Sequence, residues 1–281
     1  MSETKNSGVQ SLERALNIIE ALSARSGGLG VSEISEVTHL HKSTVHRLLS
    51  TLRSYNYVYQ DARTEKYLLG SKILEISGSI MDGFDVRTIA RPVLEELCRD
   101  VGEAVHLCIL DGLDAVYIDK IDNESRSIRM YSQIGKRIPV YSSASGKVLL
   151  AEENKDKLEL LASRLDFINF TKYTIKNKES FLSEISQIPK RGYAVDWFEH
   201  EDSVLCIAAP IFNLEKKIVA AISVSAGIWN LDENLFSKMR EEVYLAAKKV
   251  SKYMGASSYP IEFSPDENDL IRLTECKKDR Q

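Results

Sequence analysis

Apolar residues near the start of the chain recur at the spacing of an α-helix. Over residues 11–24 the apolar side chains fall on one side and charged side chains on the other, which predicts an amphipathic helix. A short second helix is predicted over 33–37 and a third over 42–55, with a tight turn at 38–41 between them. This order of helices and turn is that of a helix-turn-helix unit.

The pattern then changes to that of strands. β-favouring residues at 57–60 and 66–69 flank a polar turn at 61–65, which predicts a hairpin of the kind that forms the wing of a winged helix. Helical spacing resumes over 71–81, and we interpret this segment as a helix between two domains.

From residue 86 onward, helices and strands are interleaved over a longer stretch. The first predicted helix spans 89–101, with Pro92 tolerated in its first turn. Strands are predicted over 104–110, 115–121, 127–132, 193–196, 205–212 and 218–225. Further helices are predicted over 143–151, 155–164, 178–188 and 235–253. Strands flanked by helices in this way indicate an α+β sheet domain of the GAF-like kind.

The predicted elements group into domains. We expect a winged helix-turn-helix over 9–70, a linker helix over 71–84 and a GAF-like α/β domain over 85–256, so that the fold class is α+β. The polar segment 257–281 is expected to be a mobile tail. A chain of 281 residues with 43% hydrophobic residues is long enough for two domains with separate cores.

Composition narrows the class of protein. Cys98, Cys108, Cys206 and Cys276 are scattered without a CxxC pair, which indicates reduced thiols rather than a disulfide framework or a zinc finger. No apolar run reaches the roughly 18 residues of a membrane span, and residues 1–8 are polar, unlike a signal peptide. We therefore expect a cytoplasmic protein with no membrane contact, no metal and no cofactor.

Net charge alone does not predict nucleic-acid binding. The chain carries −4 at pH 7, whereas nucleic-acid-binding domains are usually basic. Residues 1–70 hold eight Lys and Arg against seven Asp and Glu, a net charge of +1, which leaves −5 for the remainder. Because this contrast is small, DNA binding has to be argued from the pattern of residues.

A series of sequence blocks, in matching order, resembles the IclR family of bacterial regulators. The blocks are QSLERAL (10–16), VSEIS (31–35), LHKSTVHRLL (40–49), YLLG (67–70), IGKRIP (134–139), SASGK (143–147), GYAVD (192–196) with Glu199, CIAAP (206–210) and AISVS (221–225). The resemblance covers about residues 9–254. It implies a regulator, either a repressor or an activator, that binds double-stranded operator DNA and a small effector. It also implies that the regulator is a homodimer or a homotetramer.

The third predicted helix carries the side chains that reading DNA requires. Short polar groups at its N-terminus, Ser43 and Thr44, approach base edges, and the cations Lys42 and Arg47 hold phosphates. The alternative is that Ser43 only caps the helix and that Arg47 is a solvated charge. His46 can contact a base, a phosphate or only its own helix neighbours.

Two cations of the predicted wing are further candidates for DNA contact. Arg63 and Lys66 lie in the hairpin, which can reach the minor groove or its phosphates. A polar turn on any hairpin has the same composition.

A possible carboxylate site begins at Ser143, Ala144, Ser145 and Gly146, where an apolar helix starts. Free backbone N–H groups and the positive end of the helix converge there, which suits an anion. The alternative is an ordinary N-cap with small residues for packing. This is not a Walker loop, because the preceding spaced glycine is missing.

The resemblance adds residues to this effector site. It implies the polar or small residues Asp196, Cys206, Ser223 and Ser225, together with the apolar walls Ile138 and Val204. Asp196 can accept hydrogen bonds from ligand hydroxyls. Ser223 and Ser225 alternate with apolar residues, so both project from one strand face, although a solvated serine face produces the same alternation. Cys206 is equally typical of a small core residue.

Catalytic alternatives have less support. Asp196, His200 and Cys206 are close in sequence, but no GxSxG or HExxH motif accompanies them. His106 and Cys108 are only two candidate ligands on one strand, so core packing is favoured over a metal site. We assign no catalytic residue.

These observations favour a ligand-responsive transcriptional regulator, a repressor of a catabolic operon. Its effector is expected to be a small carboxylate such as a sugar acid, because the 134–139 block is similar to family members that govern sugar-acid and uronate breakdown. The alternative is an enzyme that acts on a small acid and carries a fused DNA-binding domain.

Overall fold

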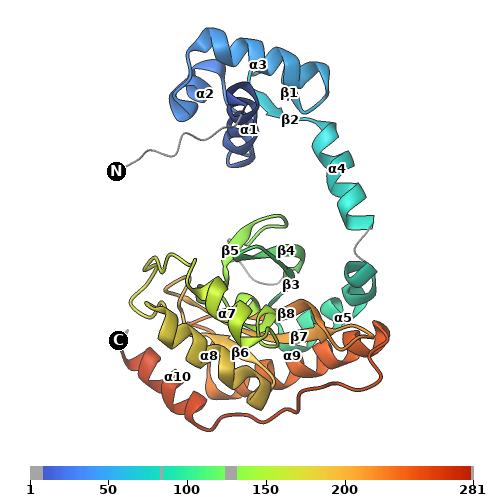
Figure 1. The fold of residues 1–281 in the computed structure, drawn as a ribbon, viewed down its shortest axis with the longest axis vertical. Coiled ribbons are helices and arrows are strands. Elements are labelled where there is room, and N and C mark those ends of the chain that lie inside the picture. The colour runs from blue at the N-terminus through green and yellow to red at the C-terminus, as the bar shows by residue number, and fades with distance from the viewer. Residues whose placement is uncertain (1–8, 83–84, 124–131, 280–281) are drawn as a thin grey trace. The chain divides into compact units, whose positions relative to one another are not determined.

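The computed structural model describes residues 9–82, 85–123 and 132–279, and it divides into two compact units, Met1–Gly83 and Phe84–Gln281 (Figure 1). We call them the N-terminal unit and the C-terminal unit. Most of the strand predicted at 127–132 lies outside the described residues.

The N-terminal unit is a winged helix-turn-helix followed by a separate helix (Figure 1). Its elements are α1 (Gln10–Ser23), α2 (Val31–Thr38), α3 (Lys42–Ser54), β1 (Val58–Gln60), β2 (Tyr67–Leu69) and α4 (Ser71–Asp82). The two strands form an antiparallel hairpin, and Leu29 adds an isolated bridge to Tyr67. Apolar side chains of α1, α2 and α3 meet in one core, where Ile18, Ile34 and Val45 are fully buried.

The turn between α2 and α3 depends on a backbone conformation that is unusual for its residue. His39 has φ 54°, in the left-handed region, and its N–H donates to Glu36 O. Histidine is one of the few non-glycine residues found there with any frequency. Ser35 Oγ donates to Leu40 O at 2.5 Å, which holds the turn and fixes the direction in which α3 leaves it.

The C-terminal unit is built on an antiparallel six-stranded sheet in the order β5-β4-β3-β8-β7-β6. The strands are β3 (Ala104–Asp111), β4 (Asp114–Ile121), β5 (Arg137–Pro139), β6 (Ala194–Asp196), β7 (Val204–Phe212) and β8 (Ile218–Gly227). The helices are α5 (Asp85–Val101), η1 (Val140–Ser142), α6 (Ala144–Leu149), α7 (Lys155–Ala162), α8 (Lys178–Arg191), α9 (Glu233–Tyr253) and α10 (Asn268–Lys278).

Helices cover both faces of this sheet. α5 and α9 pack on one face, and α6 packs on the other with α8 against it (Figure 1). Because side chains alternate along a strand, neighbouring residues of β3 enter different cores: Val105 and Leu107 join α5 and α9, whereas Cys108 faces α6. The α+β fold class predicted from the sequence is confirmed.

Three details differ from the expectations. The tail 257–281 was expected to be mobile, but residues 268–278 form α10, whose Leu273 and Cys276 are buried in the core beside α9. The helix predicted at 89–101 begins at Asp85, so Pro92 lies inside α5 rather than in its first turn. The short strand β5 was not expected, since three residues are too few to show a period.

A buried hydrogen bond anchors α10. Tyr193 Oη donates to Asp269 Oδ2 at 2.5 Å and accepts from the N–H of Asp266 at 3.0 Å, and Arg240 lies 3.6 Å from the same carboxylate. Both Tyr193 and Asp269 are buried, so neither has water as a substitute partner.

We expect Tyr193→Phe to destabilise the C-terminal unit by about 1–3 kcal/mol, because it leaves buried polar groups without a partner. Chemical denaturation measures the free energy of unfolding, and amide hydrogen exchange over residues 268–278 should become faster. Tyr253→Phe is the matched control, since Tyr253 is 57% exposed. Equal stabilities for the two variants would contradict this anchoring role.

Candidate functional site

The first candidate site is the exposed face of α3. Val45 and Leu49 are buried, whereas Lys42, His46 and Arg47 are exposed. The N-cap of α3 is His41, so Ser43 lies within the first turn, exposed, and does not cap the helix. This places short polar groups at the N-terminal end of α3 and a cation one turn later, which is the arrangement that major-groove reading requires.

The remaining DNA-contact candidates, Thr44 and the two wing residues, differ in exposure. Thr44 is half-buried in the first turn of α3. Arg63 is exposed in the turn between β1 and β2, where Asp61 Oδ1 accepts its backbone N–H at 2.7 Å. Lys66 is half-buried and lies 3.5 Å from the carboxylate of Glu33 on α2, so part of its charge is already compensated within the unit.

The second candidate site is a cavity on the α6 side of the sheet, in the C-terminal unit. Every strand of the sheet, the start of α6 and the turn after β6 contribute to its lining: His106, Tyr117, Ser132, Ile138, Ser143, Ala144, Ser145, Asp196, His200, Glu201, Val204, Cys206, Ser223 and Ser225. The hollow measures about 480 Å³ out to its mouth, but the centre of a water molecule can move in only about 30 Å³ of it. Since roughly 10–15 Å³ of such space holds one water, the enclosed part has room for only about two or three waters, and a ligand the size of a sugar acid requires its walls to move apart.

The antiparallel register assembles the polar floor of the cavity. Asp196 pairs with Cys206, which pairs with Ser225, and Cys206 Sγ lies 2.9 Å from Ser225 Oγ. Two residues along β8, Ser223 lies opposite His106 of β3. Ser223 and Ser225 are 3% and 4% exposed, so they are not the solvated face that the alternation also allowed.

The start of α6 forms one wall. Ser143 is the N-cap, and its Oγ accepts from the N–H of Gly146 at 3.1 Å. The N–H groups at the start of a helix have no partner within it, which leaves those of Ala144 and Ser145 at the cavity wall for a ligand. Gly146 itself is a packing residue: a Cβ there would lie 2.4 Å from Val140 Cα.

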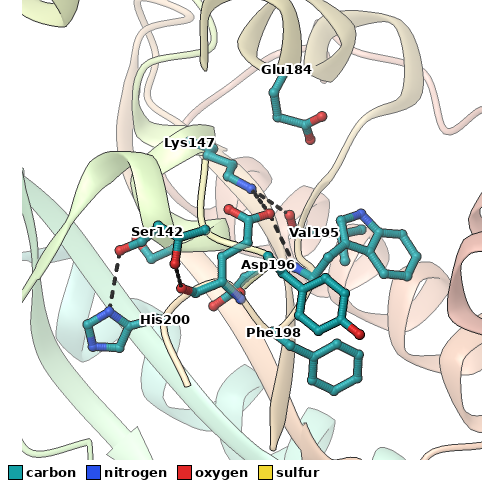
Figure 2. A network of polar contacts seen from close by, with 12 residues as sticks. Ser142, Lys147, Glu184, Val195, Asp196, Phe198 and His200 are labelled. Atoms are coloured by element: carbon teal, nitrogen blue, oxygen red, sulfur yellow. Dashed lines mark hydrogen bonds and ion pairs between the residues drawn. The ribbon is translucent and has the colours of Figure 1, made fainter. Parts of the chain in front are cut away.

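Behind Asp196 lies a buried ion pair (Figure 2). Lys147 Nζ donates to Glu199 Oε1 at 2.7 Å and to Val195 O at 2.8 Å. Lys147 is 0% and Glu199 1% exposed. The backbone N–H of Glu199 donates to Asp196 Oδ1 at 2.6 Å. The pair therefore ties α6 to the strand end that carries Asp196.

Burial shifts the titration of both carboxyl groups. It raises the pKa of Asp196 well above its ordinary value, the nearby Glu199 carboxylate raises it further, and Lys147 opposes them. The pKa of Glu199 is also raised by burial, against the lowering effect of Lys147. Backbone N–H groups of Glu199 and His200 also oppose the rise, and the balance of these effects moves Asp196 toward its neutral form, although the sequence led us to expect only an acceptor.

The turn after β6 is held in an unfavourable conformation. Phe198 has φ 61°, a region that costs a non-glycine residue about 1–2 kcal/mol. Two threonines hold this turn: Thr171 Oγ1 donates to Phe198 O at 2.7 Å, and Thr174 Oγ1 donates to Glu199 O at 2.6 Å. Clamped in this way, the turn directs Asp196 and His200 into the cavity.

The far wall carries a neutral imidazole. His106 Nε2 lies 2.7 Å from Ser132 Oγ, and its Nδ1 lies 3.5 Å from Ser225 Oγ. Burial, with a smaller effect of Lys120, lowers the pKa of His106 to about 3. A neutral imidazole offers one donor and one acceptor, so this wall adds recognition of polar groups without adding charge.

The structure brings together every effector residue predicted from the sequence except Gly146. Sequence reasoning missed five lining residues, namely His106, Tyr117, Ser132, His200 and Glu201. A signal existed for His106, because the alternation in β3 places it on the same strand face as Cys108. Its register opposite Ser223 joins two strands far apart in the chain, which no local pattern shows.

The chemistry expected of a nucleophilic site is not present in the cavity. Burial raises the pKa of the Cys206 thiol well above its usual value, and its hydrogen-bond partner is Ser225 rather than a histidine. His200 Nδ1 instead lies 3.3 Å from Ser142 Oγ. A cysteine without an adjacent base remains a weak nucleophile.

Over residues 9–82, 85–123 and 132–279, no group of three or more His, Cys, Asp or Glu is placed to hold a metal ion. None of the helices in the part of the chain that the structure describes has both the length and the apolar content needed to cross a bilayer.

Both units match known protein families. The IclR helix-turn-helix domain matches residues 11–62, and the family described as bacterial transcriptional regulator IclR C-terminal matches residues 78–252. The chain belongs to the IclR family of bacterial transcriptional regulators. It is therefore a DNA-binding regulator with an effector-binding domain.

Relatives of full length support this assignment. The chain is 36% identical over 247 residues to the HTH-type transcriptional regulator XynR of Escherichia coli, covering 88% of this chain and 98% of XynR. It is 31% identical over 253 residues to the HTH-type transcriptional repressor AllR of the same organism, covering 90% and 93% of the two chains. These relatives are regulators, which decides against an enzyme with a fused DNA-binding domain.

Solved structures show the same fold. The crystal structure of the Thermotoga maritima IclR is 30% identical, with a TM-score of 0.73 over 88% of this chain and 99% of that one. An IclR homologue from Microbacterium hydrocarbonoxydans, crystallised in complex with 4-hydroxybenzoate, is 21% identical, with a TM-score of 0.72 over 86% and 99% of the two chains.

We expect Arg47→Ala to weaken operator binding by about 1–3 kcal/mol, or roughly 5- to 150-fold, if Arg47 contacts a base edge. Thr44→Ala should act in the same direction. Binding is measured at one fixed salt concentration, because phosphate contacts make affinity depend on salt. Arg164→Ala removes an exposed cation at the end of α7 and serves as the control. Unchanged operator affinity in both α3 variants would show that α3 does not read the DNA.

Proposed function

We propose that this regulator is a repressor of a catabolic operon, released from its operator by a small carboxylate such as a sugar acid. One observation carries the effector half of the proposal. A single buried cavity combines backbone N–H groups, hydroxyls and a neutral imidazole with the residues that the family resemblance assigns to effector binding. The sign of regulation rests on AllR, a relative named as a repressor.

The polar groups of the cavity suit an acid that also carries hydroxyls. The N–H groups of Ala144 and Ser145 and the hydroxyls of Ser223 and Ser225 can donate to a carboxylate. His106 can either donate to a ligand hydroxyl or accept from it. The walls Ile138 and Val204 exclude water, which strengthens these contacts.

DNA recognition is assigned to α3, with the wing as a second contact. Lys42, Ser43, His46 and Arg47 are exposed on α3, and Arg63 is exposed at the wing tip. We propose that Lys66 contributes less to DNA contact, because it already lies beside Glu33. We propose that the protein acts in the cytoplasm, where its operator DNA would lie.

A screen by melting temperature tests the effector class. D-gluconate, D-glucuronate, D-galacturonate, pyruvate and 4-hydroxybenzoate are added one at a time to the full chain. A compound that binds only the folded protein raises its melting temperature. A shift with sugar acids and none with 4-hydroxybenzoate is expected, and the reverse result would replace the proposed class.

Asp196→Ala should lower the affinity for the effector acid by roughly 10- to 150-fold, since a hydrogen bond to a charged group is worth about 1.5–3 kcal/mol. Calorimetry measures that affinity, and an operator-binding assay measures release by the acid. Ser145→Leu should act similarly by filling the cavity beside the start of α6. Operator binding without the acid should stay close to the wild-type value, because Asp196 and Ser145 belong to a different unit from α3. A normal response of Asp196→Ala to the acid would place the effector elsewhere.

The protein should be at least a homodimer that protects a two-fold-related DNA site. One winged helix buries too little surface for specific binding alone, and exposed apolar residues of the N-terminal unit, such as Leu12 at 58% and Leu74 at 75%, are available for contact with another copy. Sedimentation and footprinting check this. A monomer that protects a single asymmetric half-site contradicts it, and a homotetramer is the larger assembly that agrees with it.

A further inference from the structure

The buried pair Lys147–Glu199 lies directly behind the cavity but does not line it. Its carboxylate is incompletely satisfied, because Glu199 Oε2 is buried without a hydrogen-bond partner among the described residues. Burying such a pair is often no better for stability than apolar packing. Stability alone therefore does not account for its presence beside Asp196.

The buried cluster of Asp196, Glu199 and Lys147 holds two carboxyl groups and one cation. Asp196 and Glu199 are both carboxyls, and Lys147 is the cation whose field acts on both of them. Lys147 makes its ion pair with Glu199, at 2.7 Å (Figure 2). If Asp196 were also ionised, the cluster would hold a net negative charge next to a cavity proposed for an anion, and the two would repel.

The other titratable groups around Asp196 do not supply a positive charge. They are His106 of β3, Tyr117 of β4, Cys206 of β7, and His200 and Glu201 of the turn, with Glu184 of α8 beside Lys147 and Glu199. Burial lowers the pKa of His200 and raises that of the Cys206 thiol, so both favour their neutral forms. Glu184 is paired with Arg191.

We propose that Lys147 and Glu199 are positioning residues: they keep the carboxyl group of Asp196 neutral and aimed into the cavity, where it donates a hydrogen bond to the carboxylate of the effector. This inference rests on the proposed function of the cavity. Glu199 acts in two ways. Its carboxylate takes the ion pair with Lys147, so the lysine stabilises an ionised Asp196 less, and its backbone N–H donates to Asp196 Oδ1 at 2.6 Å, which fixes that oxygen as an acceptor.

The same arrangement gives the cavity a preference for acids over neutral sugars. A hydrogen bond from a carboxyl O–H to a carboxylate is short and charge-assisted, about twice as strong as one between neutral partners. A ligand hydroxyl at that position receives only a neutral hydrogen bond. The proton on Asp196 therefore acts as a specificity element for the carboxylate.

Glu199→Gln tests the positioning role. The amide keeps the size of the side chain and still accepts from Lys147, but it removes the negative charge that occupies the lysine. Asp196 then becomes the counter-ion of Lys147 and ionises, since an adjacent cation favours the charged form. Glu159→Gln neutralises an exposed carboxylate, 2.8 Å from Lys178, and is the matched control.

Infrared difference spectroscopy on the full chain reads the proton without any effector. At neutral pH, subtracting the spectrum of Asp196→Asn from that of the wild type should leave the C=O stretch of a protonated carboxyl. The same subtraction in the Glu199→Gln background should leave carboxylate bands instead, and in the Glu159→Gln background it should match the wild type. Carboxylate bands in the wild type would overturn the proposal.

Binding of D-glucuronate, or of the sugar acid that gives the largest melting shift, provides the second readout, with D-glucose as its uncharged counterpart. Wild-type affinity for the acid should be constant across the neutral range, and Asp196→Asn, which keeps a neutral donor, should also be independent of pH. In Glu199→Gln the affinity should fall about tenfold per pH unit above the lowered pKa of Asp196 and recover in acid. A merely structural defect lowers affinity equally at every pH and would refute the role of Glu199.

The two readouts separate this inference from the proposed function. Absence of binding by every acid of the screen, with the protonated-carboxyl band present, contradicts the effector class and still supports the positioning of a neutral Asp196. If the acid binds but the infrared spectra show an ionised Asp196, the effector class is supported and the positioning role of Lys147 and Glu199 is refuted.

Discussion

The six-stranded sheet of the C-terminal unit is covered by helices on both faces. This covering determines where a ligand can bind in the unit. One face packs against α5 and α9 through apolar residues such as Val105 and Leu107. The other face is covered by α6, a helix of only 6 residues. Such a short cover leaves the strand ends beyond it unfilled, and the cavity lies at that place, between the start of α6 and the turn after β6.

A polar cavity inside a covered sheet requires each of its groups to be held by others, because buried polar atoms without partners are costly. The turn after β6 shows how this is achieved. Phe198 adopts a left-handed conformation, and hydrogen bonds from Thr171 and Thr174 compensate for its cost. Lys147 holds the preceding carbonyl of Val195 from α6. Contacts from three segments therefore set the direction of one functional carboxyl, which a flexible loop could not do.

The sequence predicts what local periodicity encodes and misses what depends on tertiary pairing. Long amphipathic stretches gave α1, α3 and α9 within one or two residues of their observed ends. The wall residue His106 was not recognised, since its partner Ser223 is distant in the chain and only strand register brings them together. The helix α10 was also missed, because it is held by contacts of Asp269 with Tyr193 and Arg240 rather than by a strong apolar stripe. The neutral state favoured by Asp196 likewise depends on burial and on Glu199, which a sequence pattern does not contain.

Net charge is a poor guide to both proposed sites, for related physical reasons. The N-terminal unit is almost neutral in total, yet α3 contains no Asp or Glu and presents Lys42 and Arg47 outward. DNA that approaches α3 would therefore meet a positive local field. The C-terminal part is acidic, yet an anion can enter its cavity if the groups it meets there are N–H groups, hydroxyls, a neutral imidazole and a neutral carboxyl. In a buried site such oriented dipoles act at short range with little screening, whereas the surface carboxylates are screened by solvent and salt. If the effector is an acid, as we propose, its recognition depends on how the pair Lys147–Glu199 distributes charge behind Asp196, and not on the sum of charges along the chain.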